Sequence, residues 1–214
     1  MSVNADFEDS MQSGPVGTHT LRLQCRYPVI AASHLRLRPF TLADLSPLIR
    51  VVATNRVVDG TLAVPRPFDS RQARQWIESH PLAWRTRCAV HWAVSGLDDD
   101  CLAGYVGLHD IRMEQGRAKV SFWIAERISR KERAIEATQA ALAFAFTSLQ
   151  VNTVRAHQLS GNPLVARVLR QLRMKPDAAG PQLLSRGDGR EEEVIPWSVT
   201  RTAWLASLHD RPTH

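Results

Sequence analysis

The sequence lacks the features that would direct a chain into or across a membrane. It has no run of about 18 apolar residues, so no membrane-spanning helix is predicted. Its first residues, MSVNADFEDSMQSGP, are acidic and polar, without the basic start and apolar centre of a secretory signal. We therefore expect a cytoplasmic protein with no membrane partner.

Cysteine is scarce. The three cysteines, Cys25, Cys88 and Cys101, are odd in number and do not have the spacing of metal ligands. Such a pattern is typical of free or structural thiols in a reducing compartment. The sequence therefore predicts no disulfide framework and no metal site.

Lysine is also scarce, with Lys119, Lys131 and Lys175 the only examples, so arginine supplies most of the net charge of +6. A basic surface, with a pI near 9.9, favours anionic partners such as a phosphate-bearing cofactor, nucleic acid or an acidic protein. A general arginine bias of the source proteome explains the same charge equally well. Both interpretations stay open, and a homodimer is a further expectation.

The 214 residues include enough apolar side chains to form one well-buried domain. We expect a flexible arm over residues 1–20, an extra strand within 21–33, a domain over 34–205 and a C-terminal tail over 206–214. Strands joined by hairpins, followed by alternating strands and helices, predict an α+β fold with a mixed, mostly antiparallel sheet flanked by helices. The expected order is a strand over His34–Phe40, a helix from Thr41, a helix from Asp69 to Pro81, strands over 88–95, 102–111 and 118–125, a helix over Glu132–Leu149, a strand over Val151–Leu159, a helix over Asn162–Met174 and a strand to Thr200.

Six segments between residues 35 and 205 carry a family resemblance. They are HLRLRPFTLADL, PFDSRQARQWIES, FWIAE, ERAIEATQAALAFAF, NPLVARVLRQLRM and WSVTRTAW. In this order they resemble the GNAT acetyltransferases, and within them the RimJ/RimL-like branch that acetylates ribosomal proteins. The resemblance implies a splayed sheet in a single domain. It also implies transfer of an acetyl group from acetyl-CoA to a primary amine, either a protein N-terminus or a small amine, by direct attack.

In this family, acetyl-CoA enters between two strands of the sheet and places its pyrophosphate at the start of the following helix. Unpaired backbone N–H groups and the helix dipole favour an anion there. The family has a glycine pattern at this place, whereas the stretch from Ser129 to Ala134 carries Arg130 and Glu132 in the glycine positions. The resemblance assigns cofactor binding to Ile124, Ala125, Arg130, Lys131, Arg133, Ala134, Asn162 and Arg167.

Glu132 leaves the function open. Its carboxylate would repel the phosphates, whereas Arg130, Lys131 and Arg133 can bind phosphate through their side chains. In one interpretation acetyl-CoA is still bound and the protein is an acetyltransferase. In another, Glu132 only stabilises the helix start, and the protein is an inactive GNAT-fold binding or regulatory module. A third interpretation keeps an acyltransferase with a different thioester donor.

The catalytic residues usual in the family are also replaced. Val165 stands where the resemblance expects a serine, and Lys119 where it expects a glutamate. His157 is our candidate base, because its strand lines the cofactor site in the family and a neutral imidazole accepts a proton at pH 7. Ser160 is a second candidate. Weaker candidates are His109, Asp110 and Glu114, while Trp92, Trp123 and Trp197 are predicted to be core residues.

Overall fold

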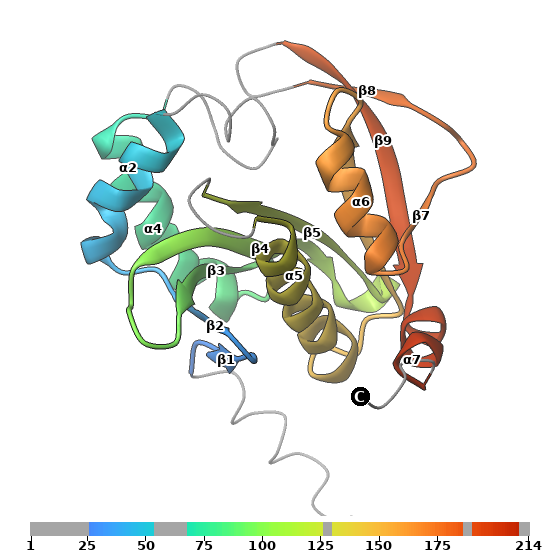
Figure 1. Cartoon of the computed structure of the whole chain (residues 1–214), viewed down its shortest axis with the longest axis horizontal. Helices are drawn as coiled ribbons and strands as arrows, with labels where there is room; N and C mark the ends of the chain where they lie inside the picture. Colours follow the sequence, from blue (N-terminus) through green and yellow to red (C-terminus); the bar gives the residue numbers. More distant parts are fainter. Residues whose placement is uncertain (1–25, 54–67, 126–129, 186–189, 210–214) are drawn as a thin grey trace, which may run out of the picture.

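The computed structural model describes residues 26–53, 68–125, 130–185 and 190–209. In these ranges a nine-stranded sheet, ordered β1-β2-β3-β4-β5-β6-β9-β7 with β8 also paired to β9, is flanked by helices (Figure 1). The predicted α+β class and the mixed, mostly antiparallel sheet are confirmed. The strands are β1 Ile30–Ala31, β2 Leu35–Pro39, β3 Val90–Gly96, β4 Leu102–Arg112, β5 Arg117–Ile124, β6 Thr153–Leu159, β7 Lys175–Pro176, β8 Gln182–Ser185 and β9 Glu191–Thr200.

Five α-helices cover the sheet within the described ranges. Each face of the sheet has its own apolar core, because successive side chains of a strand point to opposite faces. One core joins the sheet to α5 and α6, and the other joins it to α2 and α4. The helices are α2 Leu45–Ala53, α4 Ser70–Arg85, α5 Arg130–Thr147, α6 Pro163–Gln171 and α7 Arg201–His209, with 3-10 turns η1 Leu42–Asp44 and η2 Met113–Gln115.

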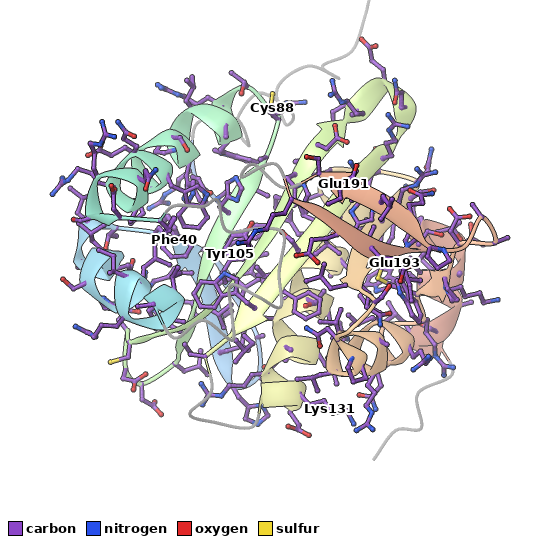
Figure 2. The ribbon with its side chains drawn as sticks, turned by 90° about the horizontal axis from the view of Figure 1, so that it is seen from above. Phe40, Cys88, Tyr105, Lys131, Glu191 and Glu193 are labelled. Carbon is purple, nitrogen blue, oxygen red and sulfur yellow. The ribbon has the colours of Figure 1, made fainter. Side chains whose placement is uncertain are left out.

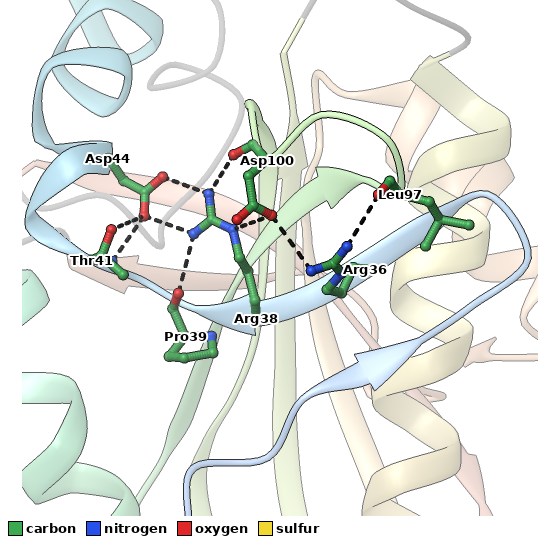
Figure 3. Close-up of polar contacts among 7 residues, drawn as sticks. All are labelled: Arg36, Arg38, Pro39, Thr41, Asp44, Leu97 and Asp100. Atoms are coloured by element: carbon green, nitrogen blue, oxygen red, sulfur yellow. Dashed lines mark hydrogen bonds and ion pairs between the residues drawn. The ribbon is translucent and has the colours of Figure 1, made fainter.

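A nearly buried ion pair joins β2 to the turn that leads into α2 (Figure 3). Both terminal nitrogens of Arg38 donate to the carboxylate of Asp44 at 2.8 Å, and the backbone N–H of Thr41 donates to the same carboxylate at 2.8 Å. Arg38 also donates to the backbone carbonyl of Asp100 at 2.7 Å. The ion pair and its hydrogen bonds fix the direction in which the chain leaves β2.

The prediction that Pro81 ends a helix is wrong, because α4 continues to Arg85. Proline removes one helical hydrogen bond and favours a kink, but the residues beyond Pro81 stay helical. The turn beyond it is held by Trp84, which is buried and donates its indole N–H to the carbonyl of Arg26 at 3.1 Å. The sequence pattern reveals the hydrogen bond that Pro81 removes, but not the long-range hydrogen bond of Trp84.

The segment before β2 is fixed more by side chains than by strand pairing. Of the strand expected within 21–33, residues 21–25 lie outside the described ranges, and the described remainder pairs with β2 at Ile30 and Ala31. Tyr27 exchanges two hydrogen bonds of 2.8 Å with the backbone of His91, and the indole of Trp92 donates to the carbonyl of Pro28 at 2.8 Å. β7, β8 and α7 are additions that we did not predict. α7 includes the first residues of the expected tail.

Candidate active site

The two central strands β5 and β6 separate after a short parallel contact. They pair at three positions, Arg117 with Thr153, Ala118 with Val154 and Lys119 with Arg155. Beyond these pairs, β5 stays with β4 as far as Ile124, while β6 pairs with β9 as far as Leu159. The predicted splay of the sheet is therefore present, and it lies between the strands that the sequence indicated. We call this gap in the pairing the split.

The helix α5 begins where the chain returns from β5. Ser129 lies outside the described residues, as does the side chain of Arg130, although Arg130 opens the helix. Lys131 and Arg133 are half-buried and form no ion pair with another residue of the described ranges. Figure 2 shows Lys131 at the edge of the molecule, well away from Tyr105 in the interior. The start of α5 therefore carries cations that remain available to an anion.

Two neighbours of these cations bear on whether the stretch suits a pyrophosphate. Glu132 is exposed, so water solvates its carboxylate and weakens its repulsion of an anion. Ala134 is buried in the core and fixes the first turn of α5 against the sheet. The N-terminal amides of a helix and nearby cations together favour phosphate. The residues at the start of α5 therefore fit the pyrophosphate of a coenzyme.

The remaining predicted cofactor residues surround the split in different ways. Ile124 is buried at the end of β5, and the backbone N–H of Ala125 donates to the carbonyl of Ala103 at 2.9 Å. That bond occupies the Ala125 N–H. By the alternation of an antiparallel pair, the backbone groups of Ile124 therefore point away from β4. Asn162 caps α6 and accepts from the N–H of Val165 at 3.3 Å, and Arg167 is exposed on the same helix.

These features match a known family. The model of the acetyltransferase (GNAT) domain matches residues 34–175. The chain belongs to this family. Acetyl-CoA is the acyl donor of GNAT acetyltransferases, so the predicted family and cofactor are confirmed, and no finding favours the inactive alternative. No curated protein matches the sequence.

Solved structures agree on the GNAT fold at low sequence identity. One is the spermidine N-acetyltransferase of Vibrio cholerae in complex with CoA and spermine, with 18% identity, a TM-score of 0.68, and 80% of this chain and 98% of that chain covered. Another is RimJ of Mycobacterium smegmatis in complex with CoA-disulfide, with 16% identity, a TM-score of 0.67, and coverage of 84% and 93%. A third is RimL, a ribosomal L7/L12 acetyltransferase in complex with coenzyme A, with 14% identity, a TM-score of 0.68, and coverage of 81% and 98%.

The candidate base of this GNAT domain lies on the face of the sheet opposite α5. His157 alternates with Ala156, which belongs to the core under α5, so its ring points to the other face. Burial lowers the pKa of His157, and the charges of Lys119 and Arg155 lower it further. The imidazole is therefore neutral at pH 7. Ser160 lies beyond β6, where its N–H donates to Glu193 at 3.1 Å, and it has no hydrogen bond with His157.

Two of the weaker candidates lie beside Lys119, which also acts on His157. Burial and the nearby charge of Lys119 lower the pKa of His109 to about 4. Asp110 accepts from Arg112 at 2.8 Å and lies 3.1 Å from the amine of Lys119, which keeps the pKa of its carboxyl low. The structure thus brings His109 and His157 to the same place. Glu114 is exposed in η2, away from this group.

A polar chain on the same face was not predicted. The hydroxyl of Tyr105 lies 3.0 Å from Nδ1 of His91 and 3.3 Å from the hydroxyl of Ser121. Gly107 makes room for it, because a Cβ there would lie 2.3 Å from the Tyr105 oxygen. His80 stacks on His91 at 4.4 Å between ring centroids, and neither of its ring nitrogens has a partner in the described ranges.

This chain extends from α4 across three strands towards the split. Ser121 is its half-buried end, and it lies on β5 two residues beyond Lys119. Its strand members lie on strands that the sequence did predict, but which residues face one another depends on the register between these strands, which the alternation does not specify. Trp92, Trp123 and Trp197 are buried, so their predicted core role is confirmed.

Among the described residues, none of the helices is both long and apolar enough to cross a bilayer. Within the same ranges, no three histidine, cysteine or acidic side chains are grouped so as to hold a metal ion.

Proposed function

We propose that this protein transfers the acetyl group of acetyl-CoA to a primary amine, either a protein N-terminus or a small amine. The observation that carries the proposal is the split between β5 and β6 in a GNAT domain with available cations at the start of α5. The acceptor class is supported by relatives of the same fold, a spermidine acetyltransferase and a ribosomal L7/L12 acetyltransferase.

On the donor side, acetyl-CoA supplies a thioester that an amine can attack directly. Lys131 and Arg133, together with Arg130, hold the pyrophosphate with their side chains, in place of the bare backbone that glycines would give. The end of β5 borders the split, where the arm that carries the thioester would lie. Holding the thioester and the amine together in this way makes a large contribution to the rate.

On the acceptor side, His157 takes the proton that the amine loses. Its neutral imidazole has the protonation state that a base requires, although its lowered pKa makes it a weak base. His157→Gln should lower kcat about 100-fold, within the usual range for a general base, and leave the affinity for acetyl-CoA unchanged. An unchanged kcat would remove His157 from this role.

Calorimetric titration with acetyl-CoA tests the donor site. We expect micromolar binding that is lost when Arg130, Lys131 and Arg133 are all changed to glutamine. The matched control changes three exposed arginines of α4, Arg71, Arg74 and Arg85, to glutamine and should bind like the wild type. Failure of the wild type to bind at millimolar acetyl-CoA would overturn the proposal.

A single change at Glu132 gives an independent test. Glu132→Gly removes the carboxylate and exposes the backbone of the first turn of α5. If this turn binds phosphate, affinity for acetyl-CoA should rise, by about tenfold for 1.4 kcal/mol of repulsion removed. An unchanged affinity would mean that the phosphates lie elsewhere.

A further inference from the structure

Four side chains lie together at the base of the split, on the face of the sheet opposite α5. The register sets His109 beside Lys119 and Lys119 beside Arg155, and neighbouring residues of paired strands share a face. His157 follows Arg155 by two positions and therefore shares that face. We call these four residues the basic row.

The positive charge of the basic row is only partly balanced. Asp110 contacts Lys119 at 3.1 Å, but its other oxygen already accepts from Arg112 at 2.8 Å. Arg155 is exposed and forms no ion pair with another residue of the described ranges. The two histidines are neutral at pH 7. Three positive charges, those of Lys119, Arg155 and Arg112, thus lie near one carboxylate, that of Asp110.

The location of the row relates it to the acceptor. α5 and α6 cover one face of the sheet, and the donor site at the start of α5 belongs to that side. An acceptor that meets the thioester within the split has to approach from the opposite face. The basic row lines the base of the split on this face, so the acceptor comes within reach of Lys119 and Arg155.

We infer that the acceptor is a primary amine with a carboxylate close to it, and that Arg155 and Lys119 bind this carboxylate. The inference rests on the proposed function and names its substrate class. A simple polyamine brings only positive charge and would be repelled by the row. A carboxylate beside the amine supplies the missing partner of Arg155, and bidentate binding by a guanidinium orients the amine. The same cations disfavour the ammonium form of the bound amine and so favour its reactive, neutral form.

Two sources of this chemistry are an acidic peptide N-terminus and a free acidic amino acid, and the assay compares them. The substrates are Ser-Glu-Glu-amide, Ser-Gln-Gln-amide, glutamate and spermidine, each with acetyl-CoA in low salt. We expect kcat/KM for the acidic peptide to exceed that for its glutamine counterpart by about tenfold, which is about 1.4 kcal/mol and lies within the range that two partly exposed charge pairs contribute. Equal values for the two peptides, or a preference for spermidine, would overturn the inference. A higher kcat/KM for glutamate than for the acidic peptide would assign the site to a free amino acid.

Variants connect the preference to the row. Arg155→Gln should abolish most of the preference for the acidic peptide, and Arg155→Lys should restore part of it. Arg74→Gln removes one exposed charge from α4, outside the row, and should keep the preference. A preference that survives in Arg155→Gln would contradict the assignment.

A binding measurement separates this inference from the proposed function. Calorimetry compares N-acetyl-Ser-Glu-Glu-amide with N-acetyl-Ser-Gln-Gln-amide on the wild type and on Arg155→Gln, without acetyl-CoA. We expect tighter binding of the acidic product to the wild type alone. If acetyl-CoA does not bind but the acidic peptide does, the proposed function fails and the anion site stands. If both peptides bind equally, the inference fails whatever the acetyl-CoA titration gives.

Discussion

Replacing Asp44 by asparagine should destabilise the fold strongly while it preserves the size of the side chain. Asp44 is 4% exposed and accepts two hydrogen bonds from Arg38 and one from the Thr41 backbone, each of 2.8 Å. Removing one partner of a buried pair costs about 3–5 kcal/mol, because the other charge stays buried without compensation. Asp100 still lies 3.3 Å from Nε of Arg38, so we expect about 3 kcal/mol, at the lower end of this range.

Urea denaturation measures this loss as the change in the free energy of unfolding. Asp100→Asn is the control, because the Asp100 side chain is 68% exposed and its loss should cost less than about 1 kcal/mol. A loss below about 1 kcal/mol for Asp44→Asn would refute the view that this ion pair joins β2 to α2.

The same ion pair predicts how stability depends on acid. Burial raises the pKa of Asp44, but the hydrogen bonds from Arg38 and Thr41 outweigh it and hold the pKa below its ordinary value of about 3.9. The contribution is therefore complete above pH 4 and is lost as the pH falls through the lowered pKa. The difference in stability between the wild type and Asp44→Asn should be constant from pH 5 to 7 and shrink below pH 4.

Three further predictions concern the polar chain and the buried histidines on the same face of the sheet. Tyr105→Phe removes the hydroxyl between His91 and Ser121 and should lower the free energy of unfolding, measured in urea, by about 1–2 kcal/mol. A loss of less than about 0.5 kcal/mol would contradict this prediction. Gly107→Ala places a Cβ 2.3 Å from the Tyr105 hydroxyl oxygen and should lower the melting temperature, whereas Gly161→Ala has open space and should change it little. The pKa values of His91 and His109 lie near 4, below the ordinary value of about 6.5. The stability that these two residues contribute is therefore complete above pH 6.5 and is lost as the pH falls towards 4. Assigned NMR resonances of His91 and His109 that titrate near pH 6.5 would contradict this.

The sequence was sufficient to predict the elements that have a clear period. Leu35 and Leu37 alternate with arginines, and both leucines are fully buried in the core under α5. The helix from Asp69 was predicted from its cap, and the cap is present, with Asp69 accepting from Gln72 at 2.8 Å. Such local signals depend on hydrogen bonds between residues close in sequence.

Long-range contacts account for what the sequence could not predict. The extension of α4 past Pro81 depends on an indole hydrogen bond to a carbonyl 58 residues away. The chain of His91, Tyr105 and Ser121 depends on the register of three strands, which the alternation of each strand does not specify. The roles of His157, Ser160 and the cofactor residues remain predictions, as do a homodimer and a nucleic-acid partner.

The measurement that tests the central claim most directly is acetyl transfer itself. The protein is mixed with acetyl-CoA and peptides that have free N-termini, and the products are followed by mass spectrometry together with the release of free thiol. We predict peptide that is heavier by one acetyl group, in amounts equal to the thiol released. Both signals should be lost in the variant in which Arg130, Lys131 and Arg133 are changed to glutamine. Binding of acetyl-CoA without either product, across peptides and small amines, would contradict the account.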